Sequence, residues 1–378
     1  MRNISVCSLL LLSTVFAGCS KKIVTTNTPT SKIYSWTQFS MGADLSYATQ
    51  MMDKGVVYKD SGIARDIFTI FKNHGCNTIR LKLWHTPKAY TSTWGGNDQD
   101  YNDLAKVETL IKKAKDLGMA VSLDIHYSDT WADPQRQEIP AAWKGLSLDV
   151  MKDSVYQYTL YILNELKAKN LVPEMIQVGN EMNNGILWPT GKVISNNFAD
   201  FGKFLNAGIK AVRDFSNTSI IKPKIIMHIA QLQHAEWWTA GITVAGVTDY
   251  DIIGLSHYAD WSTVNDMNAI TSLISKLKST YNKQVMLVEA AYWFNTKDAN
   301  GYAITQTPVA GYPFTEAGQY QYLKDLTQAV IKGGGNGVHY WAPDYISTSG
   351  GEMTARSLVD PNGNVLSGIN FMNFIYKF

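Results

Sequence analysis

Short apolar segments alternate with longer amphipathic segments along most of this chain, and this alternation limits the folds that it can adopt. Eight apolar segments have the length and composition of buried strands: Phe39–Leu45, Asn77–Trp84, Ala120–Tyr127, Met175–Glu181, Lys224–Ala230, Ile252–Tyr258, Gln284–Tyr292 and Gly337–Pro343. Helical patterns lie between them, over Leu104–Leu117, Val150–Lys169, Phe198–Phe215, Ala269–Tyr281 and Thr315–Lys332. The repeated strand–helix alternation predicts a single-domain α/β fold, the (β/α)8 TIM barrel. A doubly wound open sheet is the alternative, although no glycine-rich phosphate-binding sequence follows the first strand.

The first residues have the features of an export signal. Arg2 precedes an apolar run, Leu9–Phe16, that is too short to span a membrane, and small residues lead to Cys19. The ending Val-Phe-Ala-Gly-Cys resembles a bacterial lipoprotein signal, in which the cysteine is lipidated. We therefore expect residues 1–18 to be a lipoprotein signal peptide, 19–35 a flexible tether and 36–378 the folded domain. The alternative is an ordinary signal peptide with an incidental cysteine.

This interpretation of the N-terminus carries expectations about location and redox state. The chain would be secreted across the inner membrane and anchored to the bacterial outer membrane through lipidated Cys19. Removal of the signal and acylation would leave Cys76 as the only free thiol, so we expect no intramolecular disulfide.

Composition excludes some partners and favours others. A net charge of +2, with 17 % charged residues, provides no basic surface for nucleic acid. The chain contains 11 Trp and 20 Tyr, and aromatic rings beside turns are one way in which proteins present flat surfaces to sugar rings.

Two of the apolar segments end in a glutamate. Glu181 ends Met-Ile-Gln-Val-Gly-Asn-Glu, and Glu289 ends Gln-Val-Met-Leu-Val-Glu. An α/β barrel builds its active site at the C-terminal ends of its strands. Two carboxyl groups at that end, about 5 Å apart, are what a retaining glycosidase requires. Either glutamate alone could instead cap its strand and face solvent.

Other predicted strand ends carry groups suited to the same chemistry: Arg80, His126, Asn180, His257, Tyr258 and Trp341. A buried Arg80 needs an anionic partner, and a nucleophilic carboxylate would be one, with its pKa lowered in return. The Tyr258 hydroxyl can donate to that nucleophile, and Asn180 can bind a sugar 2-hydroxyl. Trp341 could form the floor of a sugar site. Each of these residues alone is also explained as a satisfied core residue.

Four segments make the interpretation narrower: Ser40–Ser46 (SMGADLS), Asp124–Pro134 (DIHYSDTWADP), Gln177–Gly191 (QVGNEMNNGILWPTG) and Tyr312–Tyr322 (YPFTEAGQYQY). Together with the strand-end glutamates they resemble glycoside hydrolase family 53. This family belongs to the retaining barrel glycosidases that carry the acid/base on strand 4 and the nucleophile on strand 7. The resemblance covers roughly residues 39–345.

The resemblance implies that Glu181 is the acid/base and Glu289 the nucleophile. It also implies an endo-acting enzyme that cleaves β-1,4 links in the galactan side chains of pectin without a required cofactor. Asp44, Asp129 and Trp131 lie in the matching motifs, and we expect them to support the site or contact the polysaccharide. We expect the enzyme to act as a monomer.

The loops after strands 6, 7 and 8 depart from the family pattern. His257–Thr263, Ala290–Trp293 and Trp341–Tyr345 replace the usual aromatic and proline-containing sequences. Because these loops would form the walls of the substrate subsites, the sequence indicates the chemistry more directly than the substrate. The alternatives are a glycanase of the same group acting on mannan or arabinogalactan, and a non-catalytic glycan-binding lipoprotein. Retention of both glutamates argues against the latter.

Metal binding has weak support. Some bacterial relatives bind calcium in the loop after strand 7, and here Asp298 and Asn300, beside Gly301, offer oxygen ligands. The ligands are few and irregularly spaced, so the sequence favours an ordinary Asx turn. His228, His234 and His339 form no metal-ligand spacing, and core or surface roles suffice for them.

Overall fold

The computed structural model describes Met1 and residues 37–87, 101–347 and 351–378. Residues 2–18 of the predicted signal peptide and the whole predicted tether, 19–35 with Cys19, lie outside the described residues. Residues Ile33–Phe378 form one compact unit, within which the described part is a closed barrel of eight parallel strands. No helix among the described residues is long and apolar enough to cross a membrane.

The barrel confirms all eight predicted strands. In chain order they are β1 (Ser40–Asp44), β4 (Thr78–Leu83), β5 (Ala120–Ile125), β6 (Met175–Val178), β9 (Lys224–Ala230), β10 (Ile252–Tyr258), β11 (Gln284–Ala291) and β12 (Gly337–Trp341). Each strand pairs in parallel with the next along the chain, and β1 pairs with β12 to close the barrel. The fold is therefore the (β/α)8 barrel and not an open sheet.

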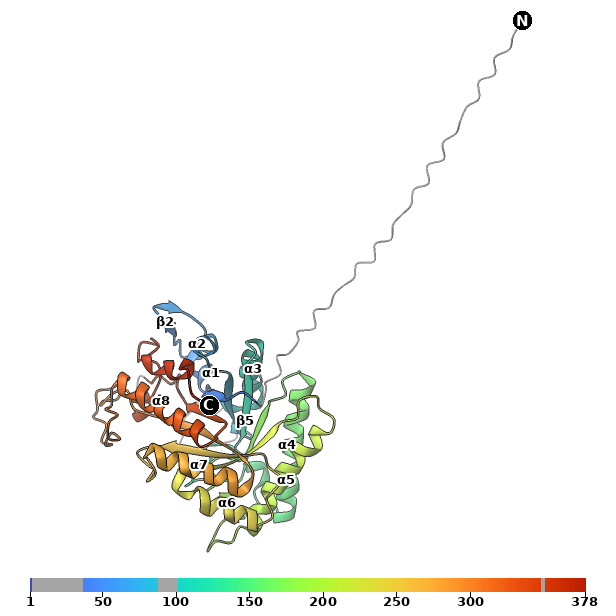
Figure 1. Ribbon diagram of the computed structural model, residues 1–378. Coiled ribbons are helices and arrows are strands. Elements are labelled where there is room, and N and C mark those ends of the chain that lie inside the picture. Colours follow the sequence, from blue (N-terminus) through green and yellow to red (C-terminus); the bar gives the residue numbers. More distant parts are fainter. Residues whose placement is uncertain (2–36, 88–100, 348–350) are drawn as a thin grey trace. The chain divides into compact units, whose positions relative to one another are not determined.

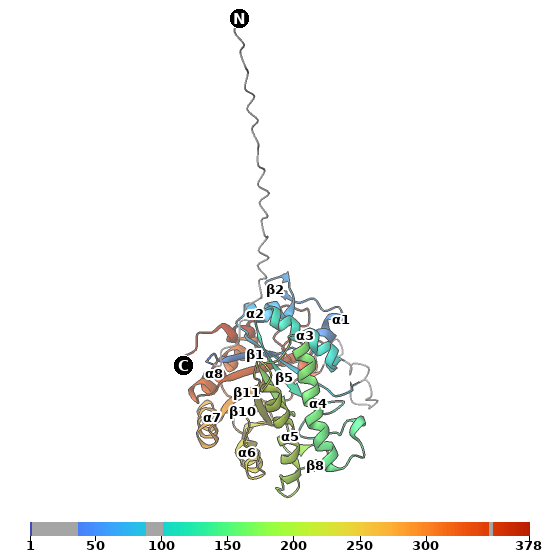
Figure 2. The ribbon, with the colours of Figure 1, turned by 90° about the vertical axis from the view of Figure 1, so that its right-hand side faces the viewer.

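Helices cover the outside of the barrel, as Figure 1 shows for α4 to α8. They are α1 (Ala48–Asp53), α2 (Ile67–Asn73), α3 (Leu104–Asp116), α4 (Leu148–Ala168), α5 (Ala199–Ser216), α6 (Ala235–Val244), α7 (Met267–Tyr281) and α8 (Glu316–Lys332). In Figure 2 the strands β1, β5, β10 and β11 lie inside the ring of helices. The apolar stripes predicted from the sequence pack against the strands, and the five predicted helices agree with the structure to within about two residues.

Within the described residues, two small hairpins and four short 3-10 helices occupy the connections. The hairpins are β2–β3 (Lys59–Asp60 with Ile63–Ala64) and β7–β8 (Gly185–Ile186 with Gly191–Lys192). The 3-10 helices are η3 (Ala141–Trp143), η4 (Leu232–His234), η5 (Glu352–Ala355) and η6 (Ser367–Asn373).

The interior of the barrel changes character along its axis. Met175, Ile226, Ile252, Met286 and Val288 form a separate apolar cluster of buried side chains. Nearer the C-terminal strand ends, buried polar side chains replace them: Asp44, Arg80, Asp124, Gln177, His228 and Ser256. Buried polar groups need hydrogen-bond partners, so this end of the barrel holds a connected polar network.

Strand β11 contains one residue more than its neighbours allow. Leu255 of β10 pairs with Leu287, but the next residue, Ser256, pairs with Glu289, so that Val288 is skipped. The pairing with β12 shifts at the same place. This β-bulge breaks the alternation of faces, and both Val288 and Glu289 lie on the inside of the barrel.

Candidate active site

A cavity of about 590 Å³ opens at the C-terminal ends of the barrel strands. Its lining includes most of the residues that the sequence singles out: Arg80, His126, Trp131, Asn180, Glu181, Tyr258, Glu289 and Trp341. The order of the strands brings these residues together from several predicted strand ends and the loop after β5. Such a cavity, lined by aromatic rings and a few convergent polar groups, is typical of a ligand site.

Glu181 follows β6 and does not belong to it. The strand ends at Val178, three residues before the predicted end, because Gly179 and Glu181 have φ angles of 84° and 44°. A glutamate in the left-handed region is uncommon and is held there by its surroundings. The Glu181 backbone N–H donates to Nδ1 of His228 (3.2 Å), and its Oε1 lies 2.6 Å from the hydroxyl of Ser256.

Glu289 is buried and held by two donors. Its Oε1 lies 2.9 Å from a guanidinium nitrogen of Arg80, and its Oε2 accepts a hydrogen bond of 2.7 Å from the Tyr258 hydroxyl. Both contacts are the ones that the sequence predicts. One carboxylate oxygen of Glu289 and one of Glu181 lie within 4.8 Å of each other. This separation is in the range of retaining glycosidases, in which no water fits between the two groups.

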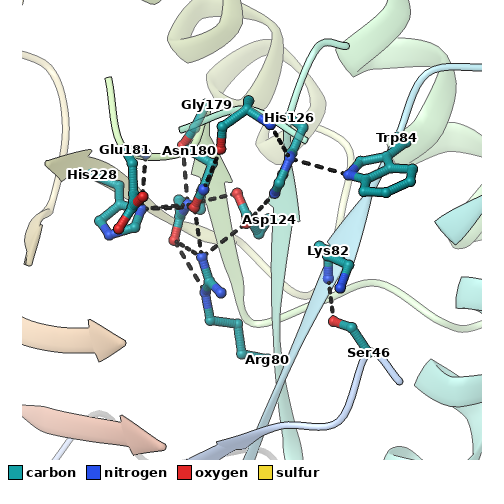
Figure 3. Close-up of polar contacts among 12 residues, drawn as sticks. Ser46, Arg80, Lys82, Trp84, Asp124, His126, Gly179, Asn180, Glu181 and His228 are labelled. Atoms are coloured by element: carbon teal, nitrogen blue, oxygen red, sulfur yellow. Dashed lines mark hydrogen bonds and ion pairs between the residues drawn. The ribbon is translucent and has the colours of Figure 1, made fainter. Parts of the chain in front are cut away.

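Arg80 is the hub of the polar network. Its NH1 binds Asp44 (2.7 Å), and its NH2 binds Asp124 (2.8 Å) and Asn180 (2.9 Å) in addition to Glu289. Figure 3 shows the guanidinium below Asn180, with Asp124 on the adjacent strand β5 and His126 just after the end of that strand. Because Arg80 is 1 % exposed, its charge must be matched locally, and three carboxylates surround it.

The two glutamates differ in their tendency to hold a proton. Burial raises the pKa of Glu181 well above its usual range, and the facing carboxylate of Glu289 raises it further. Burial also raises the pKa of Glu289, but the Arg80 guanidinium and the Tyr258 hydroxyl oppose this rise. The pair therefore shares its proton unequally, with the proton on Glu181 and the negative charge on Glu289.

The remaining predicted residues of the cavity have defined partners. His126 accepts at Nδ1 from the Trp84 indole (3.1 Å), and its Nε2 lies 3.0 Å from Asp124. The Asn180 amide donates to the backbone of Ala132 (2.8 Å), which fixes the orientation of that side chain. Trp131 and Trp341 lie 6.5 Å apart, centroid to centroid, and both line the cavity, where they can contact a sugar ring.

Three predicted site residues, His257, Asp129 and Asp44, do not line the cavity. His257 faces the outside of the barrel, where Nε2 contacts the hydroxyl of Tyr322 on α8 (2.8 Å), since successive residues of a strand point to opposite faces. Asp129 accepts the backbone N–H groups of Thr86 (2.8 Å) and Ala141 (2.7 Å) and so ties two loops together. In this structure neither side chain lines the cavity, so a supporting role is the one that their contacts favour. Asp44 also does not line the cavity and acts through Arg80.

The Asp298 turn uses its carboxylate internally. Oδ1 accepts the backbone N–H groups of Asn300 and Tyr302, and Oδ2 accepts that of Gly351, each at 2.9 Å. These bonds are those of an Asx turn tied to the following loop, which is the alternative that the sequence favours over calcium.

The chain matches the model of glycosyl hydrolase family 53 over residues 40–372. It belongs to glycosyl hydrolase family 53. This family does not depend on a cofactor.

Named relatives and solved structures agree with the family. An arabinogalactan endo-beta-1,4-galactanase of Cellvibrio japonicus is 39 % identical over 318 residues, which is 82 % of each chain. An endo-beta-1,4-galactanase of Bacillus subtilis is 32 % identical, over 82 % of this chain and 70 % of its own length. Among solved structures, the GH53 catalytic domain of Ignisphaera aggregans superimposes with a TM-score of 0.81 at 30 % identity, covering 90 % of this chain and 97 % of that domain.

Several residues of this family 53 site are not apparent from the sequence. Asp124, Gln177, His228 and Ser256 are single polar residues within apolar strands, and the structure places all four inside the barrel next to the glutamates. His228 is a buried core residue, as the sequence predicts, and it also contacts the Glu181 backbone and Ser256. Their even spacing from known inward residues, such as Ser256 two positions before Tyr258, is the signal that could have identified them.

Lys82 is a buried cation among aromatic rings. Its Nζ lies 3.8 Å from the Tyr47 ring centroid and 4.3 Å from that of Trp131. Within the described residues Nζ has no hydrogen-bond partner, so the ring faces are its main contacts. Burial lowers the pKa of Lys82 to about 8. Since Trp131 lines the cavity, Lys82 helps to hold one wall of the site.

The loops that depart from the family pattern meet at Arg356. Its NH2 binds Asp260 (2.7 Å), and its guanidinium lies 4.0 Å from the Trp293 ring centroid and 5.3 Å from that of Trp261. These partners follow β10 and β11, and Arg356 follows η5. Arg356 and the exposed ring of Trp261 line the cavity, so the divergent residues form one wall of this family 53 site.

Proposed function

We propose that the chain is an endo-acting, retaining β-1,4-galactanase that hydrolyses galactan and arabinogalactan side chains of pectin. The observation that carries the proposal is the pair of strand-end carboxyl groups within 4.8 Å, one held by Arg80 and Tyr258 and the other more strongly inclined to keep its proton. The printed names of the Cellvibrio japonicus and Bacillus subtilis relatives support the choice of polysaccharide.

In the first step Glu289 attacks the anomeric carbon of the galactosyl unit and the glycosidic C–O bond breaks. A lone pair of the Glu289 carboxylate forms a glycosyl ester with the anomeric carbon, while Glu181 transfers its proton to the departing oxygen. Arg80 and Tyr258 keep Glu289 ionised before attack and aim its oxygens. Asn180 shares the Arg80 guanidinium with Glu289 and precedes Glu181, and we assign it to the 2-hydroxyl of the reacting sugar.

In the second step Glu181 acts as a base. It takes a proton from a water molecule, whose oxygen attacks the anomeric carbon and releases Glu289 as a carboxylate. The two displacements together retain the configuration. Glu181 ends the cycle protonated and Glu289 ionised, as at the start. Trp131, Trp341 and the Arg356 wall would hold the neighbouring sugars of the polymer.

Product analysis tests this proposal. The enzyme is incubated in parallel with β-1,4-galactan, β-mannan and arabinogalactan, together with the variants Glu181→Ala and Glu289→Ala. Short galacto-oligosaccharides from galactan, lost in both variants while polysaccharide binding persists, are the expected result. Release of oligosaccharides from mannan alone would overturn the assignment of galactan as the substrate. Undiminished galactan turnover by either variant would overturn the assigned roles.

We also propose that the enzyme is a monomeric lipoprotein of the outer membrane, exported by residues 1–18 and anchored through Cys19. The sequence pattern before Cys19 and the tether composition support this location. Growth of the source bacterium, or of a suitable host, with a labelled fatty acid should label the wild-type chain and leave Cys19→Ala unlabelled. A labelled Cys19→Ala protein would refute the anchor.

A further inference from the structure

Ser256 and His228 form a buried hydrogen-bonded chain that ends on Glu181. The Ser256 hydroxyl lies 2.6 Å from Oε1 of Glu181, and Nε2 of His228 lies 2.9 Å from the same hydroxyl. Both residues are 0 % exposed and stand on adjacent strands, β10 and β9. The contact leaves Oε2 as the oxygen of Glu181 that can face the glycosidic bond.

We propose that Ser256 and His228 are positioning residues that hold Glu181 in one orientation in both of its protonation states, through the Ser256 hydroxyl on Oε1. The inference rests on the proposed function, in which Glu181 must alternate between acid and base. A hydroxyl that donates to Oε1 serves both states, because a carboxyl group protonated on Oε2 still accepts at Oε1.

With Glu181 ionised, the order runs toward the carboxylate. Nε2–H of His228 donates to Ser256, and the Ser256 hydroxyl donates to Glu181. In this tautomer Nδ1 of His228 is an acceptor, and two donors face it: the Glu181 backbone N–H (3.2 Å) and the Gln177 side-chain amide (3.0 Å). Every polar group of the chain then has a partner.

With Glu181 protonated, the order stays the same. The proton to be transferred lies on Oε2, which faces the glycosidic bond, and Oε1 still accepts from the Ser256 hydroxyl. Nε2–H of His228 continues to donate to Ser256, and Nδ1 keeps the Glu181 backbone N–H and the Gln177 amide as donors. The two states therefore differ only by the proton on Oε2.

A neutral imidazole is required throughout. Burial lowers the pKa of His228 well below its usual value, and the positive charge of Arg80 lowers it further. His228 is therefore neutral near neutral pH and keeps its ring proton on Nε2 in both states.

Aryl β-1,4-galactobiosides with leaving groups of graded acidity test the inference, because a poor leaving group needs the acid and a good one does not. Ser256→Ala should lose about 10- to 100-fold in kcat/KM on the phenyl substrate, the size expected for a hydrogen bond to a charged group, and less than about threefold on the dinitrophenyl substrate. Azide, which attacks the glycosyl-enzyme without a base, should accelerate the dinitrophenyl reaction of Ser256→Ala and not that of the wild type.

His228→Gln is the second variant, and Ser256→Thr, which keeps a hydroxyl, should restore most of the lost activity. Ser122→Ala is the matched control, since Ser122 is a buried serine inside the barrel whose hydroxyl has no partner in the described part of the chain. It should show neither leaving-group dependence nor azide acceleration. A uniform loss on all substrates in Ser256→Ala and His228→Gln would show a merely structural role and overturn the inference.

Failure of the inference and failure of the proposed function are distinguishable. Glu181→Ala must show the leaving-group dependence and the azide acceleration if Glu181 is the acid/base. If it shows neither, the assignment of Glu181 fails. If Glu181→Ala shows both while the Ser256 and His228 variants show neither, only the positioning role fails.

Discussion

Replacing Tyr258 by Phe removes one oxygen atom from the site and tests how Glu289 is kept ionised. The Tyr258 hydroxyl donates to Oε2 of Glu289 at 2.7 Å, and this bond lowers the pKa of the carboxyl group against the effect of burial. The ring itself lies 6.1 Å from that of Trp341 and would stay packed in the variant. The perturbation is therefore electrostatic rather than steric.

The expected magnitude depends on the kind of bond. A hydrogen bond to a charged group contributes roughly 1.5–3 kcal/mol, which corresponds to about a 10- to 150-fold loss in kcat/KM at neutral pH. If the whole loss falls on the ionised state, the pKa of Glu289 rises further above its usual range. Because Glu289 must be ionised to attack, the acidic limb of the pH profile of kcat/KM should move to higher pH.

The assay is kcat/KM for galactan across the pH range, with thermal unfolding as a check on folding. Tyr156→Phe is the matched control, because the Tyr156 hydroxyl also donates to a carboxylate, that of Asp214, at 2.7 Å, between α4 and α5. It should leave the pH profile unchanged. An acidic limb that stays in place in Tyr258→Phe, or moves to lower pH, would refute the reasoning.

Three further changes have defined outcomes. Arg80→Met should lower the free energy of unfolding in urea by about 3–5 kcal/mol, because it leaves buried carboxylates without their cation. An unchanged urea midpoint would show that these carboxylates take up protons at little cost. Lys82→Met tests the pH dependence of stability. The pKa of Lys82 is about 8 in the folded chain and 10.5 ordinarily, so between these pH values the unfolded chain binds more protons than the folded chain. The free energy of unfolding of the wild type should therefore rise with pH in this range, relative to that of the variant. Equal slopes for the two proteins would contradict a buried ammonium. If the exposed Trp261 ring stacks on a distant sugar, Trp261→Ala should raise KM for galactan about 2- to 12-fold and leave hydrolysis of a short aryl glycoside unchanged. Product lengths and a KM identical to those of the wild type would show that Trp261 does not bind substrate.

The sequence was sufficient to predict the barrel and the juxtaposition of Glu181 and Glu289 at one end of it. Eight apolar segments with amphipathic segments between them have few ways to bury their surfaces, and a glutamate at the end of such a segment lies at the active-site end. The partnership of Arg80 with Glu289 could be predicted from charge, because a buried guanidinium needs an anion.

The supporting residues required knowledge of which face each residue takes. His257 and Tyr258 are neighbours at one strand end, and alternation allows only one of them to point inward; the structure selects Tyr258. His228 and Ser256 were not predicted as site residues, because a single polar residue in an apolar strand shows no periodic pattern of its own. Asp129 lies in a matching motif, and its carboxylate binds backbone N–H groups of two loops, which the sequence could not indicate.

The bulge in β11 has a consequence for how this strand tolerates changes in length. Losing one residue from a strand ordinarily turns every subsequent side chain to the opposite face. Here β11 already holds one residue in excess, and Glu289 and Ala290 are paired with Ser256 and His257 as though Val288 were absent. We therefore expect deletion of Val288 to keep Glu289 pointing into the barrel, whereas deletion of Ala290 would turn Ala291 and Tyr292 away from their present faces. The inward position of Glu289 is thus protected against loss of the one extra residue that precedes it in β11.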